Sequence, residues 1–367
     1  MKIAFVIHSL SSLGGAEKIL VTLANYFVTI GYDINIILLS NSNNIFILDN
    51  KIKLFHMNNT KKKYLPKKIQ QITNQIEHIV NTTKKINPDI VIGFVVSTNI
   101  LTVIGAKLAS YPVIISEHSS YHYSLSNGRS KIETAIWRFL RRVTYPICDH
   151  LIVLTEEDKP KYHYVKDISI IKNPLILQNK HNHIQKENII LGVGRLTYIK
   201  GFDMLIKAFS MLPNNSWRLI IAGEGSERTA LEDLIAQLNL QHKVFLVGQI
   251  DDMEYLYKQA SIFVLSSRTE GFPGALCEAM GYGCCSIAFD CPTGPKEIIS
   301  HNQNGILVEA NNITLLSQTI NQLMNDDKKR EQLGDKAKKI RDELNIKNIS
   351  KRWETVLADT IKNYNRD

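Results

Sequence analysis

The chain has 367 residues, more than one hydrophobic core usually serves, so we expect two domains of roughly 170 residues each. Its hydrophobic fraction of 44% is ordinary for a soluble globular protein, and no apolar run approaches the roughly 18 to 20 residues of a membrane span. Five cysteines, an odd number, argue against a disulfide framework.

The net charge of +9 lies in the first half of the chain. Residues 1–177 hold 21 Lys and Arg against 12 Asp and Glu, while residues 178–367 hold 23 of each kind. Much of the excess lies at 61–63, 67–68, 84–85 and 138–142, and the last run alternates with aromatic residues. Such a pattern is typical of a surface that binds anionic membrane or a diphosphate-bearing lipid, and a merely solvated basic face is the alternative. Because no nucleic-acid-binding signature accompanies the charge, we expect no nucleic acid as a partner.

The first half alternates short apolar strands with amphipathic helical stretches, which implies a parallel sheet covered on both faces. The first strand is too short for a secretion signal, so we expect the chain to stay in the cytoplasm. Helices are predicted at Ala16–Thr29 and Lys67–Lys85. Strands are predicted at Lys2–Ile7, Asp33–Leu39, Asp89–Val95, Pro112–Ser116, Asp149–Leu154 and Ile168–Ile171.

Two candidate site motifs follow strand ends in this half. Gly14 and Gly15 precede the first helix, where bare backbone and a helix N-terminus can approach a phosphate or a transferred sugar closely. His118 follows the strand Pro112–Ser116 at the carboxyl edge, where open α/β sheets place their ligands. An ordinary loop at the glycines and a structural histidine are the alternatives.

The same rhythm restarts after Pro174, and the polar segment Leu175–Glu187 is predicted as the linker between domains 1–174 and 175–345. We therefore expect a second Rossmann-like sheet. Its strands are predicted at Asn188–Val193, Trp217–Ala222, Lys243–Val247, Ser261–Leu265, Cys284–Phe289 and Ile306–Val308.

A pair of cations follows the first strand of the second half. Gly192-Val-Gly194 lacks the third glycine of a dinucleotide fingerprint, which argues against hydride transfer. Arg195 and Lys200 come next and are expected to converge on two phosphates, where fixed cations stabilise the charge of a departing diphosphate. Because the chain contains no Asp-x-Asp, we expect no metal and no other cofactor.

The segment Glu270-Gly-Phe-Pro-Gly-Ala-Leu-Cys-Glu278 carries two carboxylates eight positions apart around a turn that opens a helix. Unpaired N–H groups at such a helix start bind anions. Glu270, in the loop, is placed to accept hydrogen bonds from a sugar, and Glu278 lies on the following helix. The segment thus has the shape to bind a nucleotide-sugar, with phosphate or sugar at Phe272, Pro273, Gly274 and Ala275.

Over nearly its whole length the chain resembles the retaining family 4 glycosyltransferases of GT-B fold. The resemblance rests on the two glutamates and on four further motifs in the family's order: Gly14-Gly15-Ala16-Glu17, Ser116-Glu117-His118, Gly194-Arg195-Leu196 with Lys200-Gly201, and Ala222-Gly223-Glu224-Gly225. It implies two doubly wound domains facing across a cleft, the first binding the acceptor and the second the donor. The helix at about 346–367 would pack back on the first domain.

The resemblance also implies roles for the motif residues. His118 would lie beside the transferred sugar and act in catalysis with Arg195, Lys200 and Glu270. Glu278 would accept hydrogen bonds from the ribose. The other donor-binding residues would be Gly14, Gly15 and Gly223, the base-lining Val247 and Gly248, and the turn Phe272, Pro273, Gly274 and Ala275.

The expected activity is transfer of a hexose or N-acetylhexosamine from a UDP-sugar to a lipid-diphosphate-linked saccharide, with retention of configuration. We expect it in bacterial surface polysaccharide biosynthesis, on the inner face of the inner membrane. A nucleotide-sugar 2-epimerase shares the architecture, and a non-catalytic binder of membrane or nucleic acid would use the basic half. The pair Glu270 and Glu278 with Lys200 favours transfer.

Overall fold

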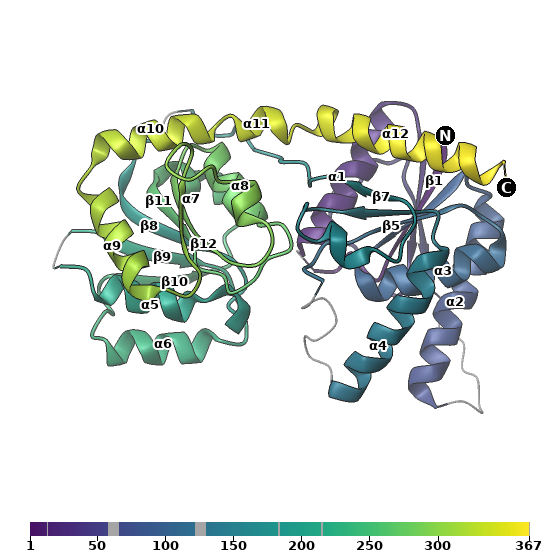
Figure 1. Cartoon of the computed structure of the whole chain (residues 1–367), viewed down its shortest axis with the longest axis horizontal. Helices are drawn as coiled ribbons and strands as arrows, with labels where there is room; N and C mark the ends of the chain where they lie inside the picture. The colour runs from purple at the N-terminus through teal and green to yellow at the C-terminus, as the bar shows by residue number, and fades with distance from the viewer. Residues whose placement is uncertain (13, 58–65, 122–129, 183, 214–215, 367) are drawn as a thin grey trace. The chain divides into compact units, whose positions relative to one another are not determined.

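A computed structural model describes residues 1–12, 14–57, 66–121, 130–182, 184–213 and 216–366. The chain divides into two compact units: the first unit is Met1–Pro174 with Ile346–Asp367, and the second unit is Leu175–Asn345. Each unit is a parallel sheet with helices on both faces (Figure 1). The predicted fold class of two parallel α/β domains is confirmed.

The sheet of the first unit has the strand order β3-β2-β1-β4-β5-β6-β7, with every pairing parallel. Its central strands are buried almost throughout, because helices cover both faces, and they are therefore continuous apolar runs. The strands are β1 (Lys2–Ile7), β2 (Asp33–Leu38), β3 (Lys53–His56), β4 (Ile90–Phe94), β5 (Val113–Ser116), β6 (His150–Val153) and β7 (Ile168–Ile170).

The last helix of the chain belongs to the first unit. It packs against α1, and the ring of its Trp353 stacks 6.2 Å from that of Phe94, at the end of β4. None of the helices traced in the described ranges is long and apolar enough to cross a membrane. The helices of this unit are α1 (Gly15–Thr29), α2 (Lys67–Ile86), α3 (Val96–Ala109), α4 (Lys131–Thr144) and α12 (Ile346–Tyr364).

The sheet of the second unit has the order β10-β9-β8-β11-β12-β13. In both sheets the order reverses between the first and fourth strands, and ligands of open α/β sheets bind at the carboxyl end of such a switch point. The strands are β8 (Glu187–Val193), β9 (Arg218–Ala222), β10 (Val244–Gly248), β11 (Ala260–Leu265), β12 (Cys285–Asp290) and β13 (Ile306–Glu309). The helices are α5 (Phe202–Ser210), α6 (Arg228–Gln237), α7 (Met253–Gln259), α8 (Gly274–Gly281), α9 (Ile313–Met324), α10 (Asp327–Ala337) and α11 (Ile340–Glu343).

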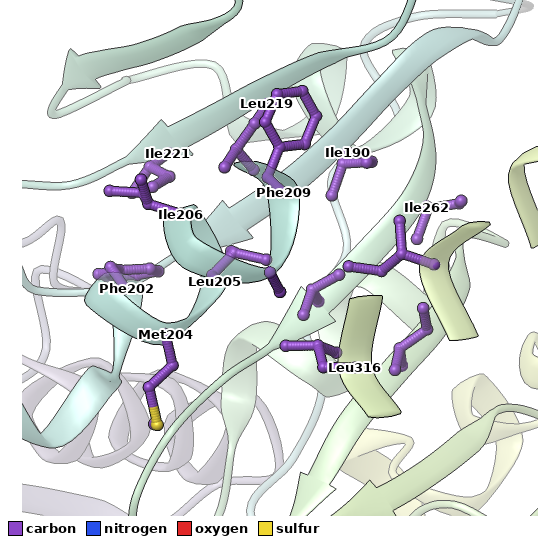
Figure 2. Packing of buried hydrophobic residues seen from close by; sticks show 14 of the residues in the cluster. Ile190, Phe202, Met204, Leu205, Ile206, Phe209, Leu219, Ile221, Ile262 and Leu316 are labelled. Carbon is purple, nitrogen blue, oxygen red and sulfur yellow. The ribbon is translucent and has the colours of Figure 1, made fainter. Parts of the chain in front are cut away.

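The core of the second unit fixes the loop that follows β8. Figure 2 shows Leu205 and Phe209 of α5 beside Ile190 of β8 and Leu219 of β9. All four side chains are buried. Because α5 is held on the sheet in this way, the short loop between β8 and α5 starts and ends at fixed points.

The predicted strands agree with the observed ones to about one residue at each end, and β3 is the strand that sequence patterns did not indicate. Its residues are half-buried or exposed, because it pairs only with β2 at the sheet edge. It therefore lacks the continuous apolar run of the central strands. The five cysteines are free and buried, so they contribute to packing.

Replacing Leu205 by alanine should destabilise the second unit by about 2 to 5 kcal/mol, because it removes a buried side chain and leaves a cavity. Urea unfolding followed by circular dichroism measures the loss. The matched control is Met211→Ala, at the exposed end of the same helix, which should stay within about 0.5 kcal/mol of the wild type. Equal effects of the two substitutions would contradict this packing.

Candidate active site

The switch point of the second unit brings a predicted cation and a predicted carboxylate together. Lys200 ends the loop between β8 and α5, and Glu270 lies in the loop between β11 and α8. The Nζ atom of Lys200 donates to Oε1 of Glu270 at 2.7 Å, and the hydroxyl of Ser267 donates to the same oxygen at 2.6 Å. The Glu270 side chain is only 8% exposed, so its charge is balanced inside the protein.

Two glycines let the neighbouring loops touch through their backbones. Gly201 has a φ of +64°, and a Cβ on it would lie 2.0 Å from the carbonyl oxygen of Ser266. Gly223 has a φ of +143°, and its Cβ would lie 1.9 Å from the carbonyl oxygen of Gly194. Both the conformation and the space require glycine. The motif glycines therefore set how closely the loops after β8, β9 and β11 approach.

An ion pair that the sequence did not indicate also holds these loops. Arg268 donates from two nitrogens to the two carboxylate oxygens of Asp203, each at 2.8 Å, and its guanidinium lies 3.9 Å from the centre of the Tyr198 ring. Its backbone N–H donates to the carbonyl of Ile199 at 2.8 Å. Arg268 thus secures the loop that carries Lys200 against the loop that carries Glu270.

The second predicted cation is not part of this pair. The Arg195 side chain is exposed and forms no ion pair with a residue in the described ranges. Its placement leaves the charge available to an anion from solvent. Across the same ranges, His, Cys, Asp and Glu side chains form no group of three or more suited to a metal ion.

The turn after Glu270 ends in the N-terminus of α8. In the described part of the chain, no acceptor pairs with the backbone N–H groups of Gly274 and Ala275. Pro273 is buried before them, and Phe272 is half-buried. These N–H groups, on a positive helix end, suit an anion.

The loop after β12, which comes later in the sequence, packs against this turn. The hydroxyl of Thr293 donates to the carbonyl oxygen of Glu270. A Cβ on Gly294 would lie 2.7 Å from Cδ of Pro273. The contacts of the segment Asp290–Glu297 could not be predicted from the sequence. In the structure this segment packs on the predicted anion-binding turn.

Glu278 lies one turn beyond Ala275 in α8 and is half-buried. The hydroxyl of Tyr257 donates to its Oε2 at 3.0 Å. The predicted base-lining residues lie at the end of β10: Val247 is 38% exposed, and the carbonyl of Gly248 accepts the N–H of Gly223 at 2.7 Å. The structure thus brings Gly223 and Gly248 together at neighbouring strand ends.

In the first unit, His118 lies two residues beyond the end of β5. Its Nε2 lies 3.0 Å from the hydroxyl oxygen of Ser116, and its ring stacks on Phe94 at 4.8 Å. Its Nδ1 is buried without a hydrogen-bond partner in the part of the chain described. Burial lowers the pKa of His118 to about 3, so the imidazole is neutral at pH 7.

Glu117, to which the sequence motif assigned no role, is a buried carboxyl beside this histidine. The hydroxyl of Tyr145 donates to its Oε1, and the amide of Asn99 lies 3.4 Å from the same atom. Burial raises the pKa of Glu117 to about 7, although Tyr145, Arg141 and Asn99 each lower it. Carboxyl groups whose pKa is raised toward 7 by burial are characteristic of functional sites.

The prediction that the basic run 138–142 faces lipid is wrong for Arg141. This side chain is 3% exposed, its guanidinium stacks 3.8 Å from the centre of the Tyr121 ring, and it donates to the Tyr121 carbonyl at 3.1 Å. Its charge balances the interior cluster around Glu117 instead. Arg138 and Arg142 are exposed, as predicted, and the basic run 61–63 lies outside the described residues.

The predicted glycines open α1 at the switch point of the first unit. Gly14 is the N-cap, and Gly15 is the first helical residue. A Cβ on Gly14 would lie 2.0 Å from Oε2 of Glu17, so this carboxylate folds back over the glycine at the positive end of the helix. The site occupied by the Glu17 oxygens is one that suits an anion.

Comparison with known proteins agrees with this geometry. The profile of "Glycosyltransferase Family 4" matches residues 13–175, and that of "Glycosyl transferases group 1" matches residues 176–340. A relative from Campylobacter jejuni, named a GalNAc-α-(1→4)-GalNAc-α-(1→3)-diNAcBac-PP-undecaprenol α-1,4-N-acetyl-D-galactosaminyltransferase, is 32% identical over 99% of both chains. The chain belongs to the family 4 glycosyltransferases. The resemblance read from its motifs is confirmed.

Two further matches extend over nearly the full length of this glycosyltransferase. The amylovoran biosynthesis glycosyltransferase AmsD of Erwinia amylovora is 27% identical and covers 97% of this chain and 99% of its own. The structure of Anabaena HepE in complex with UDP superimposes with a TM-score of 0.77 at 18% identity, covering 98% of this chain and 100% of the other. The fold is GT-B, and family membership favours transfer over the epimerase and over a non-catalytic binder.

The buried carboxyl makes folding stability pH-dependent in a defined direction. The pKa of Glu117 is raised from 4.5 to about 7 in the folded state, so the folded chain binds the proton more tightly than the unfolded chain. The stability of the wild type relative to Glu117→Gln should therefore be constant below about pH 4.5 and fall as the pH rises to about 7, by at most about 1.4 kcal/mol per pH unit.

Unfolding of both proteins by urea across this pH range measures the difference. The contribution of His118 has the opposite sign, being lost as the pH falls from about 6.5 toward 3, and it cancels because both proteins retain that residue. A stability difference that does not change with pH would show that folding does not raise the pKa of Glu117.

Proposed function

We propose that this glycosyltransferase transfers a hexose or N-acetylhexosamine from a UDP-sugar to a lipid-diphosphate-linked saccharide, with retention of configuration, in bacterial surface polysaccharide biosynthesis. The observation that carries the donor assignment is the Lys200–Glu270 pair at the switch point, 2.7 Å apart. The names of the relatives support the acceptor: one acts on an undecaprenol diphosphate saccharide and another in amylovoran biosynthesis. The HepE structure that matches this chain contains UDP.

The leaving diphosphate binds at the positive groups of this edge. Lys200 and the exposed Arg195 supply charge, and the N–H groups of Gly274 and Ala275 supply hydrogen bonds. Negative charge grows on the diphosphate as the glycosidic bond breaks, so fixed cations lower the barrier more than they tighten substrate binding. Oε1 of Glu270 is occupied by Lys200 and Ser267, and its Oε2 accepts from the hydroxyls of the donor sugar.

The nucleoside lies along the same edge. Glu278 accepts from the ribose, and Val247 and Gly248 line the base beside Gly223. In this proposal the second unit is the donor domain and the first unit is the acceptor domain.

His118 acts as a neutral hydrogen-bonding group. Because burial holds its pKa far below neutrality, it contacts sugar hydroxyls without adding charge to the site. Gly14 and Gly15 approach the transferred sugar through the start of α1, where the Glu17 carboxylate lies over Gly14. In a retaining transfer the acceptor hydroxyl attacks from the face of the leaving group, and a diphosphate oxygen takes its proton.

The partner of the first unit is an anionic membrane surface, reached through α4. The apolar residues Ile132, Ile136, Phe139 and Val143, at helical spacings of four, three and four, are each at least 48% exposed. Arg138 and Arg142 are exposed on the same helix. A helix with an apolar face flanked by cations lies in the plane of a membrane interface, with cations on the headgroups.

Replacing Lys200 with alanine should reduce turnover by roughly 10²-fold or more and raise the Kd for UDP, because it removes a fixed cation from the diphosphate and leaves Glu270 with an uncompensated charge. Arg195→Ala should also reduce turnover. The assay is product formation from a panel of nucleotide-sugars with a lipid-linked acceptor. Lys207→Ala, an exposed lysine of α5, is the control and should behave as the wild type.

Near-normal turnover in both the Lys200 and Arg195 variants would end the diphosphate assignment. Failure of every nucleotide-sugar in the panel, with the wild type correctly folded, would end the proposed function itself.

Replacing Phe139 with aspartate should weaken binding to vesicles that contain anionic lipid, because it places a charge in the apolar face of α4. Arg138→Glu with Arg142→Glu should weaken it by about 1 kcal/mol for each lost cation, and added salt should mask that difference. Turnover on a short soluble acceptor should survive. Leu108→Asp, at an exposed apolar residue of α3, is the control. Unchanged vesicle binding would leave α4 as a solvated helix.

A further inference from the structure

A buried tyrosine holds the carboxylate that we assign to the ribose. The hydroxyl of Tyr257, in α7, donates to Oε2 of Glu278, in α8, at 3.0 Å. Tyr257 is only 1% exposed. Burial raises the pKa of its hydroxyl well above the ordinary value, so this group remains a donor across the working pH range.

The ring of Tyr257 is itself fixed by its neighbours. It stacks on Tyr282 with 5.7 Å between centroids and an interplanar angle of 18°, and it lies 6.2 Å from the ring of Phe263 in β11. The thiol of Cys284 donates to its backbone carbonyl at 2.9 Å. These contacts restrict the ring, and an aromatic side chain held in this way positions a hydrogen bond at little cost in side-chain entropy.

The stack continues to the segment that joins the two units. The hydroxyl of Tyr282 accepts the N–H of Gln178 at 2.8 Å and donates to the carbonyl of the same residue at 3.1 Å. A Cβ on Gly281 would lie 2.8 Å from Leu177. The end of α8 is thus anchored to the linker, so the helix that carries Glu278 is fixed at the end opposite the anion-binding turn.

We propose that Tyr257 is a positioning residue for the recognition of the donor ribose: its hydroxyl fixes the rotamer of Glu278 while the tyrosine stack fixes the backbone of α8. A carboxylate has about four acceptor sites, so the bond from Tyr257 leaves capacity for ribose hydroxyls. Because the bond fixes the direction of these acceptor sites, less entropy is lost in ordering the Glu278 side chain when the ribose binds. This proposal rests on the proposed function.

The test compares the ribose preference of Tyr257→Phe with that of the wild type. The measured quantity is the ratio of the Kd of 2′,3′-dideoxy-UDP to that of UDP, obtained by calorimetry. The wild type should prefer UDP, and Tyr257→Phe should reduce this ratio by about 10-fold, the scale of one hydrogen bond to a charged group. In assays with the donor, KM should rise with little change in kcat, because the ribose contact is the same in the ground and transition states.

The matched control is Tyr255→Phe, which makes the same change on the same helix at an exposed tyrosine and should keep the wild-type ratio. Glu278→Gln should also reduce the ratio, and adding Tyr257→Phe to it should reduce the ratio no further, because both act on one contact. This cycle remains informative if the single tyrosine variant is less stable.

Two results would overturn the proposal, and neither is a failure of the proposed function. Unchanged Kd values for both nucleotides in Tyr257→Phe would show that the hydroxyl does not position the carboxylate. Equal weakening of UDP and its dideoxy form would assign Tyr257 to the stability of the unit alone. By contrast, a wild type that binds neither nucleotide would overturn the donor assignment.

Discussion

The site depends on one partly buried ion pair, Lys200 with Glu270. A carboxylate that is 8% exposed needs compensation, and here a lysine and the Ser267 hydroxyl share one of its oxygens. That requirement ties the loop after β8 to the loop after β11, which are adjacent because the strand order reverses there. The Arg268–Asp203 pair and the glycine contacts keep the two loops at this distance.

Sequence patterns predicted the features that are contiguous along the chain. Strands such as β1 and β11 are continuous apolar runs, because parallel sheets are buried on both faces, and the turn between Glu270 and Glu278 is one unbroken segment. Long-range pairs carry no such signal: Arg268 lies 65 residues from Asp203, and Tyr257 lies 21 residues from Glu278. Their partners are chosen by the packing of whole elements, which a single sequence does not display.

Helix α4 shows the limit of periodicity most clearly. Its spacing gives a regular apolar stripe, which in an ordinary surface helix would face the core. In this chain the stripe is exposed, and the helix buries Thr134, Arg141 and Thr144, while Trp137 and Leu140 of the same helix pack partly buried against the core. Arg141 is accommodated because Glu117 and the ring of Tyr121 surround it, and those residues become its neighbours only in the folded chain. The sequence pattern predicts that the helix has two different faces, but it does not indicate which face is buried in the fold.

The opposed faces of α4 also constrain how this enzyme can vary. One inserted residue turns everything after it by about 100° around the helix axis. An insertion before Phe139 would therefore carry Arg141 out of its aromatic setting and turn Phe139 and Val143 away from the stripe begun by Ile132. The buried face and the exposed face of α4 both depend on the same helical register. The helix can therefore tolerate substitutions at single positions, but not insertions or deletions that change its length.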